Sequence, residues 1–282
     1  MSTNPDVCMG SADTAPATRN GLSFPFGVKR ADTEPMDLLP GVQWLQVPLS
    51  SSMSTVNCWA LRDGDGWAVV DVGMHLPMAE ARWQALTAQD GPLGGAPTRV
   101  IATHLHADHM GMAGELFRQH GCELWMTRGE YLQAKQIIED YARPTLPEHL
   151  RHLARAGWTP EQLATYQAFG KSMAPLPGCY HRMKEGDVLQ FEDQRWQVIT
   201  SCGHSPEHAS LFNAEQGLLI AGDQLLPDTS SNVSVMPVEP WGNPMKDWLA
   251  SLHKFATLFD DEVLVLPAHG SPFRGIPERA RQ

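Results

Sequence analysis

The chain has 282 residues, 42% of them hydrophobic, so it is long enough to bury a large core and has the composition of a globular protein. It carries 21 Lys and Arg against 32 Asp and Glu, and the formal net charge of −11 argues against nucleic acid as a partner. The sequence contains no apolar run of about 18 residues and no signal-peptide pattern, so we expect a soluble, cytoplasmic protein that does not bind membranes.

The cysteines do not form a recognisable framework. There are five of them, an odd number, and they are widely spread and never arranged as C-x-x-C. This spacing argues against a disulfide scaffold and against a thiolate zinc site. Any metal must therefore be held by histidines and carboxylates.

Residues 1–35 are rich in Ser, Thr, Asn, Pro and Gly and show little periodicity, which predicts a poorly ordered N-terminal arm. We expect residues 36–282 to form the globular domain. From Val42 onward the short apolar runs "VQWLQV", "VNCWAL" and "WAVVDV" predict strands, and an Asp-Gly turn joins the last two as a hairpin.

A helix and a strand follow the hairpin. Helical spacing in "LPMAEARWQALTAQ" predicts the helix, and "TRVIAT" predicts a strand that ends at a cluster of histidines. After the cluster comes a helix over "HMGMAGELFRQHG", with Gly121 as its C-cap, and then a strand at "CELWM". The order strand, loop, helix, strand is typical of an α/β protein.

A helical insertion is predicted at about 129–185, where three helical stretches are broken by Pro and Gly. Thr159 before Pro160 is a good start for one of these helices. The remaining chain predicts four strands, a helix and a last strand, in the runs "DVLQF", "RWQVITS", "HASLFNA", "GLLIAGD", "PMKDWLASLHKFATLF" and "EVLVLPAHG".

The stretch "THLHADH" concentrates metal-ligand side chains at the end of a predicted strand: His104, His106, Asp108 and His109. In an extended segment His104 and His106 point to the same side, and the other two follow once the chain turns. Imidazole and carboxylate together suit Zn²⁺, Fe²⁺ or Mn²⁺. We take zinc as the default and leave iron and manganese open.

Three later donors also follow strand-like runs directly: His204, Asp223 and His269. Each lies beside a small residue, Gly203, Gly222 or Ala268, which lets the backbone pass close to a ligand. If these strands end at one edge of a sandwich, all the donors converge there.

The T-H-x-H-x-D-H run with the later His, Asp and His resembles the metallo-β-lactamase fold superfamily, over residues 40–275. The resemblance implies an α/β fold, a four-layer αββα sandwich with the helical insertion added. It also implies two divalent metal ions, with His104, His106 and His204 on the first, Asp108, His109 and His269 on the second, and Asp223 bridging both. Asp108 would then be both a ligand and the catalytic base.

The same resemblance implies an enzyme, a hydrolase that cleaves an ester-like bond (thioester, lactone or ester) of a small molecule through a metal-bridging hydroxide. A bridging aspartate is usually lacking in true β-lactamases of this superfamily, so Asp223 favours the thioesterase, lactonase and phosphodiesterase branches. The alternatives left open are a small-molecule phosphodiesterase, a mononuclear iron persulfide dioxygenase, a β-lactam hydrolase and a metal-bearing binding protein without turnover.

Substrate choice is predicted to lie in the helical insertion and in the long Pro- and Ser-rich loop at 226–244. Both would border the mouth of the site. The opposing interpretation is that the aromatic residues of the insertion only pack its helices onto the sandwich. The insertion is also a candidate for a homodimer contact.

Overall fold

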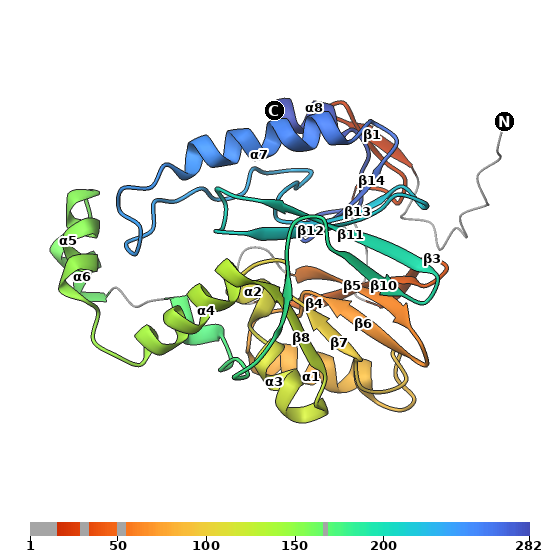
Figure 1. Ribbon diagram of the computed structural model, residues 1–282, viewed down its shortest axis with the longest axis horizontal. Helices are drawn as coiled ribbons and strands as arrows, with labels where there is room; N and C mark the ends of the chain where they lie inside the picture. The colour runs from red at the N-terminus through yellow and green to blue at the C-terminus, as the bar shows by residue number, and fades with distance from the viewer. Residues whose placement is uncertain (1–15, 29–33, 50–54, 166–168) are drawn as a thin grey trace.

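The computed structural model describes residues 16–28, 34–49, 55–165 and 169–282, and these fold into four layers (Figure 1). Two β-sheets lie face to face, and helices cover the outer face of each. On the first sheet pack α1 (Pro77–Thr87) and α3 (Ala113–His120), and on the second pack α7 (Pro244–Leu258) and α8 (Ile276–Arg281). The predicted αββα sandwich is confirmed.

The first sheet has seven strands in sequence order, antiparallel up to β6 and parallel from there on. The hairpin of β5 and β6 turns at the predicted Asp-Gly sequence, where Asp63 lies opposite Gly66. The strands are β3 (Met36–Leu39), β4 (Val42–Pro48), β5 (Thr55–Asp63), β6 (Gly66–Val70), β7 (Arg99–Ile101), β8 (Glu123–Thr127) and β9 (His181–Met183).

The second sheet has five strands, also in sequence order, and its last pair is parallel. Because β13 and β14 run in the same direction, the residues that follow them leave from the same edge of the sheet. The strands are β10 (Val188–Phe191), β11 (Gln194–Ser201), β12 (His208–Asn213), β13 (Leu218–Gly222) and β14 (Leu264–Pro267).

The apolar core fills the space between the sheets and the spaces between each sheet and its helices. Alternation along β5 divides its side chains between two of these spaces. Trp59 and Leu61 pack between the sheets, while Cys58 and Ala60 pack under the helices of the first sheet. Trp59 stacks on Trp44 of β4 with ring centroids 5.8 Å apart, which adds to the burial of two large rings.

Part of the predicted N-terminal arm is structured. Residues 16–28 contain the hairpin β1 (Ala17–Arg19) and β2 (Leu22–Phe24), whose turn uses positive φ at Asn20 and Gly21. Leu22 and Phe24 are buried in the core between the second sheet and its helices. The expectation of a poorly ordered arm is therefore wrong for this segment, and its remaining parts at 1–15 and 29–33 lie outside the described residues.

The helical insertion follows β8 and is shorter than predicted. The last residues of the predicted range are not helical, because they include β9, which lies at the edge of the first sheet, parallel to β8. Thr159 starts α6 as predicted: its Oγ1 accepts the N–H of Gln162, whose side chain accepts the N–H of Thr159. The insertion comprises α4 (Arg128–Tyr141), α5 (Pro147–Arg155), α6 (Pro160–Thr165) and a 3₁₀ turn, η1 (Phe169–Ser172).

None of the helices within the described residues combines the length and the apolar composition that crossing a membrane requires.

Candidate metal centre

The predicted donor residues come together at one edge of the sandwich, where loops of both sheets meet. His104 and His106 lie in the loop after β7, and Asp108 and His109 lie in the short helix α2 (Ala107–Met110). From the second sheet come three donors, each just beyond a strand: His204 after β11, Asp223 after β13 and His269 after β14.

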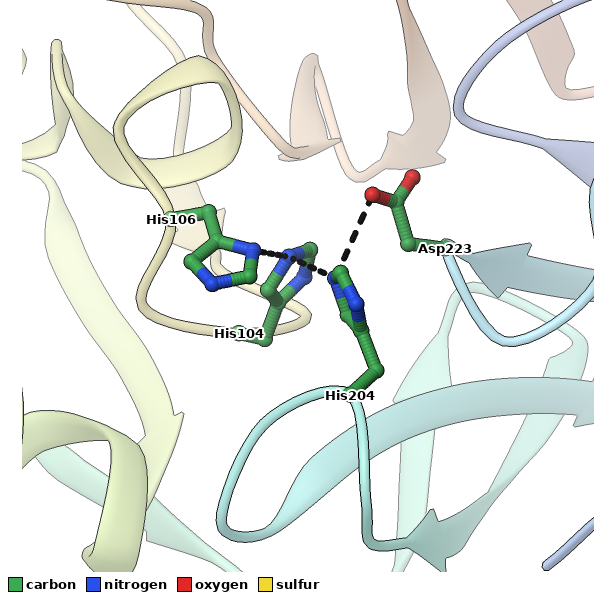
Figure 2. Close-up of side chains that lie close together, drawn as sticks. All are labelled: His104, His106, His204 and Asp223. Atoms are coloured by element: carbon green, nitrogen blue, oxygen red, sulfur yellow. Dashed lines mark hydrogen bonds and ion pairs between the residues drawn. The ribbon is translucent and has the colours of Figure 1, made fainter. Parts of the chain in front are cut away.

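The first group of donors consists of His104, His106, His204 and Asp223, whose side chains point toward one another in Figure 2. His104 Nε2 lies 2.9 Å from His106 Nδ1 and 3.1 Å from His204 Nε2. His204 Nε2 lies 3.3 Å from Asp223 Oδ2. Ligands about 2.0–2.1 Å from a tetrahedral metal lie roughly 3.3 Å from each other, so this spacing is that of a shared cation.

The second group consists of Asp108, His109 and His269. Asp108 Oδ2 is 3.2 Å from His269 Nε2 and 3.5 Å from His109 Nε2. Asp223 lies between the two groups, since its Oδ2 is also 3.5 Å from His109 Nε2 and its Oδ1 is 3.6 Å from His269 Nε2. Its carboxylate therefore faces donors of both groups.

Outward hydrogen bonds orient the imidazoles. His204 Nδ1 lies 2.7 Å from the carbonyl oxygen of Asn232, and His269 Nδ1 lies 3.3 Å from that of Thr55. A carbonyl oxygen only accepts, so each Nδ1 carries the proton and each Nε2 presents its lone pair to the centre.

The donor set fits a divalent metal. Three inward atoms, His109 Nε2, His269 Nε2 and Asp223 Oδ1, are buried and have no hydrogen-bond partner within the described part of the chain. Leaving such atoms unpaired costs free energy, and coordination to a cation would satisfy them. Imidazole nitrogen and carboxylate oxygen are the ligands that zinc, iron and manganese accept.

Glycines beside two of the donors permit close packing against protein neighbours. Gly222 has φ +52°, and a Cβ there would lie 2.5 Å from His208 Nε2. Gly203 has φ +107°, and a Cβ there would lie 2.4 Å from the backbone nitrogen of Trp248. A larger residue at either position would displace the loop that carries Asp223 or His204.

Asp71 is a buried residue of the centre that the sequence interpretation missed. Directly after β6, its carboxylate accepts the N–H and the hydroxyl of Thr103, at 2.8 Å each, and lies 2.8 Å from His109 Nδ1. Thr103 Oγ1 in turn lies 3.0 Å from His104 Nδ1. One carboxylate therefore orients a histidine in each group.

Glu130, in the first turn of α4, was also missed. Its side chain is fully buried and accepts three hydrogen bonds, from the N–H of Leu105, the hydroxyl of Ser205 and the N–H of Glu207, at 2.7 to 2.8 Å. Burial raises its pKa to about 7, against the opposing effect of these donors. Glu130 joins the loop of His104 and His106 to the loop of His204.

His208 lies behind the donors and contacts the backbone of one of them. It is completely buried on β12, and its Nε2 accepts the backbone N–H of Asp223 at 3.2 Å. Its contact is thus with the backbone that carries Asp223. Burial lowers the pKa of His208 to about 3, so the ring is neutral.

The donors influence one another's protonation. Burial, and then the neighbouring histidines, lower the pKa of His104, and the same causes lower that of His106 to about 4. Burial alone would raise the pKa of Asp108 and Asp223, but the charge and hydrogen bonds of His109 hold both well below the usual range. Burial would lower the pKa of His109, but the carboxylates of Asp223, Asp108 and Asp71 raise it above the usual range. Without an ion, the centre therefore combines neutral His104 and His106, ionised carboxylates and a proton on His109 that a bound metal would replace.

Comparison with known proteins places this geometry among related chains. The profile of the family described as "Metallo-beta-lactamase superfamily" matches residues 53–269. A solved structure described as a beta-lactamase domain protein from Burkholderia ambifaria superposes with a TM-score of 0.82 and 36% sequence identity, covering 93% of this chain and 76% of that one.

Two curated relatives carry names of enzymes. The acyl-coenzyme A thioesterase MBLAC2 of Gallus gallus is 26% identical over 243 residues, which is 83% of this chain and 79% of that protein. Hydroxyacylglutathione hydrolase of Xylella fastidiosa (strain M23) is 30% identical over 168 residues, 59% of this chain and 44% of that enzyme. The second match thus covers less than half of the enzyme.

Proposed function

This chain belongs to the metallo-β-lactamase superfamily, and we propose that within it the protein is a dinuclear metal hydrolase that cleaves an ester-like bond, first of all a thioester, of a small molecule. The single observation that carries the proposal is the position of Asp223. It faces three histidines that belong to two separate donor groups, at 3.3 to 3.6 Å.

The two donor groups are the ligand sets that we propose for two cations. His104, His106 and His204 would hold one ion, Asp108, His109 and His269 would hold the other, and Asp223 would be shared. Divalent ions bound there would supply Lewis acidity toward a carbonyl oxygen and lower the pKa of a bound water toward neutrality. The coordinating side chains are pre-oriented by Asp71, Asn232 and Thr55, so little ordering is needed on binding.

Asp108 is the proposed general base. Its side chain is 18% exposed, against 10% for Asp223 and 3% for Asp71, so it is the most accessible carboxylate of the three. Its lowered pKa keeps it ionised at neutral pH, and an ionised carboxylate can accept a proton from an attacking water. Its Oδ2 faces His269 and His109 and would hold the second ion, so the proton would be accepted by the other carboxylate oxygen, Oδ1.

A thioester is preferred because both enzyme relatives are named for thioester substrates, and a lactone or an oxygen ester needs the same attack on a carbonyl carbon. The single-metal persulfide dioxygenase alternative is less well supported, because the second donor group here contains both His109 and His269. A dinuclear site with a shared carboxylate suits hydrolysis.

The test is metal analysis together with a substrate panel. Protein purified without chelator should contain close to two divalent ions per chain, and should hydrolyse acyl thioesters in a way that chelation abolishes and added zinc, iron or manganese restores. His269→Ala should lose metal and activity, while His253→Ala, an exposed histidine of α7, should lose neither. The proposal would be contradicted if the protein contained one ion per chain and consumed oxygen with a persulfide. It would also be contradicted if the protein hydrolysed only a phosphodiester or a β-lactam.

A further inference from the structure

An open pocket lies between the helical insertion and the loop that links β13 to α7, residues 223–243. We call it the insertion pocket. In Figure 1 this long loop runs out toward α5 and α6. The walls of the pocket include Ile137 and Asp140 of α4, Leu146 before α5, and Met236, Pro237 and Val238 of the loop.

One wall of the insertion pocket begins at the metal centre. Glu130, in the first turn of α4, is hydrogen-bonded to the loops that carry His104 and His204. Ile137 follows it by seven residues on the same helix, which is about 10 Å along the helix axis. The helix therefore leads from the donor loops directly into the pocket.

The opposite wall of the insertion pocket, formed by the loop, also begins at the metal centre. The carbonyl oxygen of Asn232 is bound to His204 Nδ1, and Ser231 Oγ contacts the carbonyl oxygen of Asp223. Met236 is four residues beyond Asn232, so its Cα lies within about 14 Å of that contact. Both walls thus run outward together from the His204 side of the centre.

The outer end of the insertion pocket is held together by contacts between α5 and the loop. His152 Nε2 lies 3.3 Å from the carbonyl oxygen of Val235, and the guanidinium of Arg155 lies 6.0 Å from the ring centre of Trp241. These contacts join two segments about eighty residues apart in sequence, and they connect the two walls of the pocket at this end.

The lining of the insertion pocket selects the kind of group that it takes. Six of its lining residues are apolar: Ile137, Pro144, Leu146, Met236, Pro237 and Val238. Beside them lie the uncharged polar side chains of Gln133, Gln136 and Thr145, and His149. Asp140 is the charged side chain among the described lining residues, and it repels phosphate and carboxylate groups. The lining therefore suits an uncharged, apolar chain and disfavours the anionic end of a thiol carrier.

We propose that the insertion pocket is the acyl-chain subsite of the enzyme, and that the substrate is a thioester with an apolar acyl chain of medium length. This inference rests on the proposed hydrolase function. In the reaction, the oxygen of water bonds to the acyl carbon and the carbon–sulfur bond breaks. A carboxylic acid and a free thiol leave, the thiol having taken a proton from the water.

Each methylene that enters the pocket should improve kcat/KM about fourfold, which is the fold-change equivalent to burying one methylene. Butanoyl and octanoyl coenzyme A differ by four methylenes, so the octanoyl thioester should be the better substrate by more than about tenfold, even if only two of the four are buried. Thioesters that end at an acetyl group should be poorer than both.

The experiment compares variants on opposite walls with a neighbouring control. Met236→Trp and Leu146→Trp should each reduce the octanoyl to butanoyl ratio of kcat/KM at least tenfold, because the larger side chain occupies the chain's volume. Leu132→Trp changes an exposed residue of α4 that does not line the pocket, and should keep the wild-type ratio. A wild-type ratio near one, or a ratio unaffected by both pocket variants, would overturn the proposal.

A binding measurement separates this proposal from the function on which it rests. 1-Octanol, a neutral chain with no scissile bond, should bind the wild-type protein. In calorimetry Met236→Trp should raise the Kd of octanol at least tenfold, while Leu132→Trp should not. Octanol binding of this pattern without any thioester turnover would support the subsite and refute the proposed function. Thioester turnover with no chain-length preference and no octanol binding would refute the subsite alone.

Discussion

The carboxylate of Asp71 lies 2.8 Å from Nδ1 of His109, and the same oxygen accepts the hydroxyl of Thr103. Asp71 has the left-handed backbone conformation, φ 60°, directly after β6, which turns its side chain under the donor loop. Because Thr103 also contacts His104, the position of one buried side chain is linked to ligands of both groups.

Asp71→Asn should weaken metal binding without unfolding the protein. An amide offers one acceptor oxygen in place of two, so the contacts to Thr103 and His109 cannot all be kept. We expect a loss of about 10- to 100-fold in zinc affinity, measured by competition with a chromophoric chelator. Asp90→Asn, at an exposed position, should bind zinc as the wild type does, and equal affinities in both variants would contradict the role of Asp71.

Asp108→Ala should reduce turnover by at least about 10²-fold, the loss typical of removing a general base, while circular dichroism shows the native fold. The measurement is kcat with the best thioester of the panel, on protein whose metal content is determined in parallel. Asp193→Ala is the matched control on an exposed turn. Activity of Asp108→Ala within a few-fold of wild type would remove this residue from the chemistry.

Glu130→Gln should destabilise the fold and disturb the spacing of the two donor loops. All three of its partners are donors, so the NH₂ of glutamine would face an N–H or a hydroxyl. We expect a decrease of about 1 to 3 kcal/mol in the free energy of unfolding and weaker binding of the metal held by His104 and His204. On the same helix, Glu139→Gln at an exposed position should change neither quantity, and matching results for the two variants would rule the role out.

The metal-free protein should lose stability in acid because of His208. Its pKa is lowered to about 3 in the fold and is about 6.5 when unfolded, so the unfolded state binds more protons between these values. The contribution of His208 is thus present above about pH 6.5 and is lost as the pH falls toward 3.

The measurement is urea unfolding of chelator-treated wild type and His208→Gln between pH 4 and pH 7. Glu130 acts in the opposite direction over part of this range, since its pKa is raised to about 7, but it is present in both proteins and cancels from the difference. The wild type should gain on the order of 3 kcal/mol more than His208→Gln as the pH rises. Parallel curves for the two proteins would show that His208 does not carry this dependence.

Local patterns in the sequence predicted an α/β protein and the donor residues, and the family resemblance that these donors carry predicted the αββα sandwich. The cluster at 104–109 and each of the three later donors follow an apolar run directly. Their position at strand ends could therefore be predicted without knowing the order of the strands in the sheets. Asp71 has the same signature, an acidic residue after the apolar run "WAVV", and could have been included on that basis. Glu130 could not, because it lies inside a helix and its partners are 25 to 77 residues away.

The N-terminal hairpin depends both on a local sequence signal and on packing against remote parts of the chain. Asn20-Gly21 is a strong local signal for a two-residue β-turn, and the composition of the surrounding segment masked it. What makes the hairpin stable is remote: Ser23 pairs with Arg274, and Leu22 and Phe24 are buried against Phe273 and the C-terminal part of the chain. Such packing has no counterpart in local sequence patterns.

The origin of the donors has a consequence for how the protein matures. His104 and His109 are made early in translation, whereas Asp223 and His269 are added more than one hundred residues later. During synthesis the growing chain therefore holds a histidine loop without the carboxylate that both groups share. If two ions bind as proposed, they can find their full ligand sets only after the second sheet has been made, and they would then link the loops of the two sheets.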